Sequence, residues 1–140
     1  MIDLVEKALI QAIIDSEFLP EEDIYFENRD FDPKGKAMWG KLSFVPSEPF
    51  VDELGECGTD RLVGFMQFDL NVPTGDGTGA IKKKAREIRQ VFTAGKYFES
   101  SGQQVTISSC GISAGRYVES YYRLILTINF YAFIPRALQN

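Results

Sequence analysis

Few side chains in this sequence of 140 residues could carry out catalysis or bind a metal. The chain has no histidine, which excludes Ser-His-Asp and Cys-His catalysis and most zinc and iron sites. Its two cysteines, Cys57 and Cys110, do not form a CxxC pair, so a thiolate zinc site is not expected. A disulfide between them is open on sequence alone, although two lone thiols are typical of a reducing compartment. We therefore expect a non-enzyme with no catalytic residues, no cofactor and no bound metal.

Three acidic residues lie close together in the first quarter of the sequence, and they can be interpreted as a metal site or as part of a solvated loop. Glu27, Asp30 and Asp32 could serve a small metal-dependent hydrolase if rigid elements brought the three carboxylates together. The alternative is a solvated loop, and the loop is the interpretation that we favour.

A glycine-rich run, 75–84, resembles a phosphate-binding loop that enters a helix. It lacks both the Walker spacing and a GxGxxG pattern. We interpret it as a turn from a strand into a helix, capped by Thr78 or Asp76.

The charge of the chain is distributed unevenly. The whole chain has a formal net charge of −5, yet residues 80–96 carry six basic side chains and one acidic side chain. On a helix, Lys82, Arg86 and Arg89 form one stripe, with Lys83 beside it. The stripe predicts contact with DNA phosphates or with an acidic partner surface, and the alternative is a solvated helix face.

The N-terminal residues 2–17 have the pattern of a helix with two apolar stripes. The stripe expected to face the core comprises Val5, Ala8, Leu9, Ala12 and Ile13. A second stripe of Ile10, Ile14 and Phe18 lies on roughly the opposite side. It indicates a subunit interface, a deeper core position or cover by residues 46–60. Trp39, on the polar face of its strand, indicates an interface or a side chain that the neighbouring loop covers.

The hydrophobic pattern predicts one α+β domain over residues 1–140. We expect helices at 2–17 and 80–94 and strands at 24–27, 37–45, 62–72, 105–109 and 121–134. Consecutive strands favour antiparallel pairing, so the prediction is a mostly antiparallel twisted sheet of four or five strands with two helices packed on one face. The glycine-punctuated connection 46–60 is long enough to suggest an assembly loop. No segment has the length of a membrane span, so we expect a soluble cytoplasmic protein.

An ordered set of turn residues and aromatics resembles the tail terminator (tail-completion) proteins of long-tailed bacteriophages, of the lambda minor tail protein U type. The resemblance covers nearly the whole chain and rests on these residues: Ile24–Asn28, Phe31, Pro33, Trp39, Leu42–Pro46, Leu54, Gly55, Gly58, Arg61, Gly64, Asn71–Pro73, Gly75, Gly77, Phe92, Gly95 and Tyr121–Phe133.

The resemblance implies an α+β subunit that assembles as a ring, usually a hexamer, on the tail tube in the virion tail. Such a ring ends tube polymerisation and presents a surface to the head-completion (connector) protein, with transient passage of DNA through it. It implies no catalytic or cofactor residues. Two other hypotheses for the function remain open. The protein could be a different phage assembly protein, namely a head–tail connector or a tail tube protein, or it could be a small nucleic-acid-binding module that uses the basic stripe.

Overall fold

The computed structural model describes residues 2–51, 55 and 58–135, and over these residues the protein is mostly β, with 46% strand and 23% helix. The elements along the chain are α1 (Ile2–Asp15), the 3₁₀ turn η1 (Glu21–Asp23), β1 (Ile24–Tyr25), β2 (Trp39–Pro46), β3 (Phe50–Val51), β4 (Thr59–Pro73), α2 (Gly79–Val91), β5 (Tyr97–Ser100), β6 (Gln103–Ile112), β7 (Arg116–Val118) and β8 (Tyr121–Pro135).

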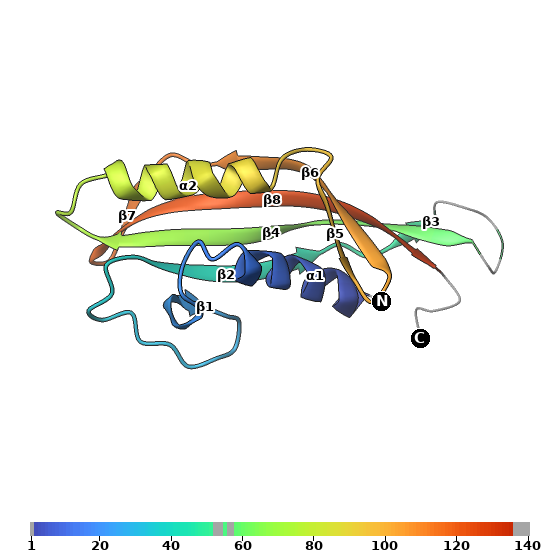
Figure 1. The fold of residues 1–140 in the computed structure, drawn as a ribbon, viewed down its shortest axis with the longest axis horizontal. Coiled ribbons are helices and arrows are strands. Elements are labelled where there is room, and N and C mark those ends of the chain that lie inside the picture. The colour runs from blue at the N-terminus through green and yellow to red at the C-terminus, as the bar shows by residue number, and fades with distance from the viewer. Residues whose placement is uncertain (1, 52–54, 56–57, 136–140) are drawn as a thin grey trace.

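All eight strands belong to one sheet, in the order β1-β2-β4-β8-β6-β5, with β3 paired to β4 and β7 paired to β8. The central strands β4 and β8 are antiparallel and pair along fifteen residues each, from Thr59 opposite Pro135 to Pro73 opposite Tyr121. Long paired strands twist and coil, and the sheet curls along its length (Figure 1).

The predicted fold class was wrong. The sheet has eight strands rather than four or five, it is curled, and it is mixed because β1 pairs with β2 in parallel. The three missed strands, β3, β5 and β7, have only two to four residues, too few for alternation to be visible in the sequence. They form because the long strands β4, β6 and β8 offer backbone groups that need partners.

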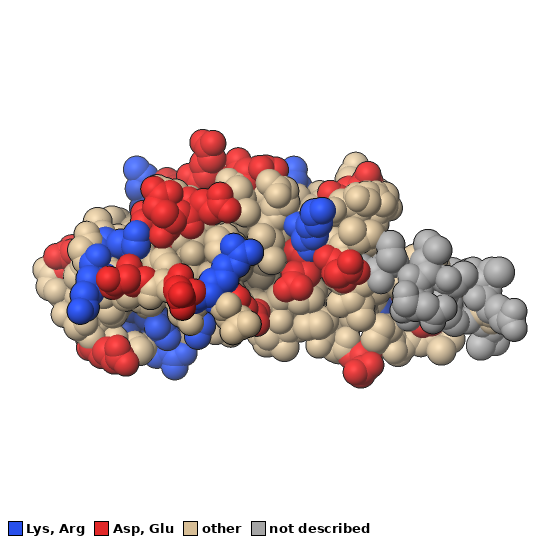
Figure 2. All heavy atoms as spheres, turned by 90° about the horizontal axis from the view of Figure 1, so that it is seen from below, with Lys and Arg blue, Asp and Glu red and all other residues tan. Residues whose placement is uncertain are grey.

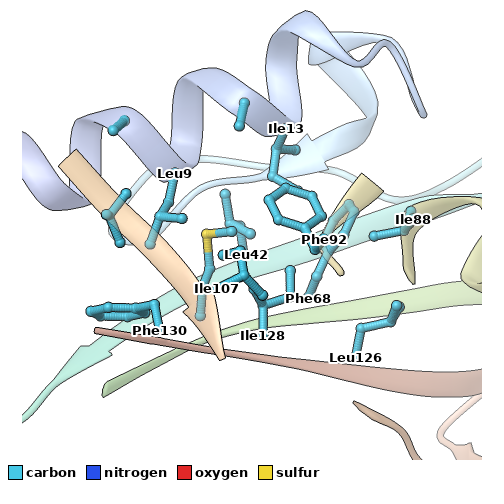
Figure 3. Close-up of a cluster of buried hydrophobic side chains, with 14 of the residues drawn as sticks. Leu9, Ile13, Leu42, Phe68, Ile88, Phe92, Ile107, Leu126, Ile128 and Phe130 are labelled. Atoms are coloured by element: carbon cyan, nitrogen blue, oxygen red, sulfur yellow. The ribbon is translucent and has the colours of Figure 1, made fainter. Parts of the chain in front are cut away.

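The two helices pack onto the sheet through one hydrophobic core (Figure 3). The apolar stripe predicted for α1 is confirmed, since Val5, Ala8, Leu9, Ala12 and Ile13 are all buried. The helix α2 contributes Ile81, Ala85 and Ile88, and Phe92 follows it. These side chains belong to the same core cluster as the α1 stripe and the buried side chains of β4 and β8. Full burial of one such aliphatic or aromatic side chain stabilises the fold by roughly 1.5–3 kcal/mol.

The connection 46–60 is only partly described. Its first part forms β3, which pairs with the start of β4 through Phe50 opposite Arg61. Residues 52–54 and 56–57, which include Cys57 and lie in the middle of the expected assembly loop, are outside the described residues.

Candidate assembly surfaces

The basic stripe of α2 is exposed. Lys82, Arg86 and Arg89 each follow a buried residue of the same helix, so the stripe lies beside the buried stripe, about one residue's rotation around the axis. Helix α2 packs against β8, β4 and β6, and its buried face fixes the direction in which the cations point. The nearby Lys84 forms an ion pair with Glu87 at 3.5 Å, whereas the three stripe cations form no ion pair with another residue of the described part of the chain. The sequence-predicted stripe is therefore a real surface feature.

A shallow hollow of about 380 Å³ borders the N-terminal half of this stripe. Lys82 and Arg86 form one wall, and the segment 112–115 between β6 and β7, together with Tyr122, forms the other. The stripe therefore runs beside the β6–β7 side of the sheet rather than over its centre.

Cys110 on β6 lies within electrostatic reach of the end of the stripe. Burial raises the pKa of the Cys110 thiol to about 11, and the positive charge of Arg89 partly opposes that rise. Cys110 is a free thiol in the structure. It is held in its protonated form at neutral pH, which does not suit a nucleophile.

The second apolar stripe of α1 is neither fully buried nor fully exposed. Ile10, Ile14 and Phe18 are all half-buried, and two of them, Ile10 and Phe18, pack against the hydrophobic core. The subunit's own packing thus uses part of this stripe. What remains accessible is compatible with a contact between copies, and that role stays a prediction.

The hollow beside α1 is lined by both charged and apolar groups. It has a volume of about 340 Å³, and its walls come from α1, from the segment after β1 and from β2. The lining residues are Asp3, Glu6, Lys7, Ile10, Phe26, Glu27, Arg29, Leu42 and Phe44. The pKa of Glu6 is raised, first by burial and then by the negative charges of Glu27 and Asp3. The carboxylates at this hollow therefore lie close enough to repel one another.

The acidic residues considered for metal binding serve the local backbone instead. A carboxylate oxygen of Glu27 accepts the Phe44 N–H at 2.6 Å, and one of Asp32 accepts the Lys34 N–H at 3.0 Å. Asp30 is exposed. Within the part of the chain that the structure describes, no three histidine, cysteine or carboxylate groups gather as a metal site. The geometry of the described residues therefore does not support the hypothesis of a metal-dependent hydrolase.

The aromatic side chain that the sequence placed at an interface is covered by its own chain. Trp39 is 6% exposed, and it contacts Phe31 and Tyr121 with ring centroids 5.4 and 5.3 Å away. Phe31 also stacks on Tyr25, so the loop after β1 folds back over the outer face of the sheet. Cover by the loop, the alternative that the sequence left open, is confirmed. Any partner of Trp39 would meet its aromatic cover rather than the indole.

A polar network beside Trp39, on the paired strand β4, was missed from the sequence. Asp69 and Asn71 are 5% and 0% exposed, although strand alternation places them on the polar face. Arg123 donates to the Asn71 side-chain oxygen at 2.7 Å and lies 3.9 Å from an Asp69 carboxylate oxygen. The sequence shows polar residues in each of the two long strands. That they form one network follows only from the strand register, which pairs Asn71 with Arg123.

The glycine-rich run 75–84 is a turn followed by a helix, as expected. Gly75 and Gly77 have φ of +96° and +78°, a conformation that glycine adopts without strain. Thr78 occupies the N-cap position of α2, but its side chain makes no capping hydrogen bond.

Comparison with known proteins adds a decisive observation to this geometry. The sequence profile described as "Phage tail terminator protein" matches residues 4–130. This chain belongs to the phage tail terminator family. The resemblance seen in the sequence is thereby confirmed, and it assigns the protein a structural role in the phage tail.

Solved structures are similar to this tail terminator family member as well. One of them superposes with a TM-score of 0.74 at 17% sequence identity. The superposition covers 94% of this chain and 95% of that chain. At that identity the likeness concerns the fold alone. No curated protein matches the chain significantly.

The family assignment suggests a non-enzyme and supports contact with other tail proteins. It places the protein in the virion tail. Among the described helices, none has the length and apolar character needed to cross a membrane.

Proposed function

We propose that this protein caps the tail tube of a long-tailed phage as a ring, ends tube polymerisation and forms the surface that joins the head. The observation that carries the proposal is the family match over residues 4–130, nearly the full chain. A structural protein of the tail acts by binding other copies of itself or other tail proteins. The exposed cations of α2 and the mixed hollow beside α1 are surfaces suited to contacts of this kind.

The partners in this proposal are further copies of the chain in a hexameric ring, the tail tube protein below and the head-completion protein above. Assembly takes place in the host cytoplasm, and DNA passes transiently through the ring. Each phosphate contact adds affinity that slows DNA release. We therefore propose that Lys82, Arg86 and Arg89 do not all line the channel, and that some of them contact acidic groups of a neighbour.

The proposal is tested by removing the protein from an assembling phage. Without it, electron microscopy should show overlong tubes or tails that never join heads. Supplying the wild-type chain in trans should restore normal length, which is the control. Tails of normal length that join heads in its absence would show that the protein has another role.

The nearest alternative, a connector or tail tube protein, differs in position and copy number. A terminator should be detected by immunogold labelling at the head-proximal end of the tail only. A tube protein would label the whole tail length, and a connector would stay with tail-less heads.

The exposed basic stripe also favours a second candidate function, binding of nucleic acid. In that case the monomer should be retained on double-stranded DNA at low salt, and Arg86→Glu should abolish retention. No retention at low salt would dismiss this candidate.

A further inference from the structure

We propose that copies of this chain associate head to tail, with the basic stripe of α2 on one copy contacting the hollow between α1 and β2 on the next. The inference rests on the proposed ring and names the two surfaces that meet in it. The partner is a second copy of the same chain.

The two surfaces lie toward opposite edges of the sheet. The hollow is lined by α1, by the segment after β1 and by Leu42 and Phe44 of β2, next to the β1 edge in the strand order. The stripe runs beside the second half of β6, beyond the residues that pair with β5, as the positions of Cys110 and 112–115 show. In Figure 1, α2 lies along β8 and β6 in the upper part of the view, whereas α1 and β1 lie beside β2 in the lower part. One copy therefore cannot bring its own stripe to its own hollow.

The hollow has the chemistry to receive a lysine or arginine side chain. Ile10, Phe26, Leu42 and Phe44 line it with apolar surface, which suits the aliphatic stem of a long cationic residue. Its carboxylates, Asp3, Glu6 and Glu27, can pair with the cationic tip. Lys7 and Arg29 also reach its walls, so the hollow is not uniformly acidic. An incoming cation relieves the mutual repulsion of the carboxylates.

The surroundings of the two surfaces have opposite charge. Residues 1–32 carry ten acidic and two basic side chains, against one acidic and six basic in residues 80–96. The view from the α1 and β1 side shows carboxylates gathered there, with some Lys and Arg among them (Figure 2). Like surfaces on two copies would repel, so a two-fold contact through either patch alone is disfavoured. Contact between the unlike surfaces brings opposite charges together.

A contact between two different surfaces has a defined consequence for assembly. Each copy uses its stripe once and its hollow once, so copies add in one direction and close into a ring if the rotation per copy permits. A contact of this kind gives the repetition that a ring on a tube requires, and the rotation per copy determines whether the ring closes.

The first test compares two charge reversals of equal size. Arg86→Glu lies in the stripe, whereas Lys34→Glu, the control, lies in the exposed loop after β1 and outside the hollow. Self-association of each purified chain is measured by sedimentation velocity over a concentration series. We expect Arg86→Glu to weaken association by about tenfold or more and Lys34→Glu to leave it nearly unchanged. Raised salt should weaken association of the wild type in the same direction.

The second test mixes two variants that are each deficient. Glu6→Lys reverses a charge of the hollow and should weaken association as Arg86→Glu does. In an equimolar mixture, an unchanged stripe meets an unchanged hollow, and the new glutamate meets the new lysine, so association should return. Circular dichroism checks that each variant is folded. If Glu6→Lys does not fold, Asp3→Lys at the exposed first turn of α1 replaces it.

Three outcomes would overturn the inference. They are a wild type that stays monomeric at every concentration, normal association of Arg86→Glu, and a mixture that recovers nothing although both variants are deficient. The last outcome would show that the stripe and the hollow each contact some other surface of the neighbouring copy rather than one another. None of these bears on tail length in a phage that lacks the protein, so the proposed function fails or survives by its own experiment.

Discussion

The two helices of this protein have similar amphipathic patterns but different surroundings. Helix α1 contacts β5 and β6 and buries one stripe fully, and its second stripe, Ile10, Ile14 and Phe18, is half-buried. Helix α2 also buries one stripe, but the neighbouring stripe of Lys82, Arg86 and Arg89 is exposed. The second stripe is thus apolar and half-buried in α1, and cationic and exposed in α2.

The comparison shows how one small domain can separate folding from assembly. Side chains that both hold the core and face a partner cannot change without affecting both. The exposed cations of α2 contribute little to folding, since surface charges are worth about 0–1 kcal/mol each. They are therefore available for orientation and specificity between copies.

The largest expected effect tests whether both helices belong to the same core. Leu9→Ala in α1 and Ile88→Ala in α2 each remove a side chain that is 0% exposed. Each should lower the free energy of unfolding by about 2–5 kcal/mol, measured by urea denaturation followed by circular dichroism. Gln90→Ala at an exposed position of α2 is the control and should change it by less than about 0.5 kcal/mol. A small loss for Ile88→Ala alone would show that α2 is only loosely docked.

A smaller effect on stability, with a large effect on assembly, is expected at the half-buried stripe of α1. Ile14→Asp should cost about 1–3 kcal/mol, since a carboxylate replaces a partly buried apolar group. The chain should stay folded and lose self-association, measured by sedimentation velocity. Gln11→Glu adds the same charge at an exposed position of the same helix and serves as the control. Complete unfolding of Ile14→Asp would count against the interface role of this stripe.

The third prediction uses Cys110 as a reporter of the stripe. With its pKa at about 11 rather than 9.0, the thiol should react with iodoacetamide at pH 8 roughly 100-fold more slowly than an unperturbed cysteine. In a Cys57→Ser background, Arg89→Gln should slow the reaction further, because a stabilising cation is lost. Lys83→Gln, the control, should not. A faster reaction in Arg89→Gln would mean that Arg89 shields the thiol rather than lowering its pKa.

The raised pKa of Cys110 also sets the direction of a pH effect on folding. The folded state holds the thiol proton more tightly than the unfolded state does. The resulting contribution to stability is present below pH 9.0 and is lost as the pH rises toward about 11. Cys110→Ala should therefore show a weaker fall in melting temperature over that range than the wild type.

The smallest effect is expected at the hollow beside α1. Because burial and the neighbouring carboxylates raise the pKa of Glu6 in the folded state, its contribution to stability is full below the ordinary pKa of 4.5 and is lost as the pH rises through the folded-state pKa. Glu6→Gln, neutral at every pH, should slightly raise the melting temperature at pH 7 and leave it unchanged at pH 4. Dilute samples keep the chain monomeric. A lower melting temperature at pH 7 would indicate that Glu6 is paired with Lys7 or Arg29.

Much of this protein could be predicted from the pattern of its residues. The two helices and the long strands at 62–72 and 121–134 appear in the structure, because periodic burial over ten or more residues is a strong signal. The exposure of Lys82, Arg86 and Arg89 follows from their position one residue after each buried residue of α2. The family could be recognised because turn residues and aromatics keep their order along the chain.

The fold class could not be predicted, for a reason visible in particular elements. Strands of two to four residues such as Tyr97–Ser100 carry no period, and they are strands only because β6 lies beside them. The parallel pairing of Ile24–Tyr25 with β2 depends on where the connecting loop returns. Both are decided by distant pairing rather than by local pattern.

The sequence by itself determined which residues form amphipathic helices and long strands, since local periodicity decides that before any distant contact forms. Only the tertiary structure decided what each surface became. It buried Asp69 and Asn71 beside Trp39 and left the basic stripe of α2 exposed. It also brought Glu6 and Glu27, twenty-one positions apart, to one hollow. The physical reason is that burial depends on which segments cover a face, and curling of the sheet and return of the loops set that cover.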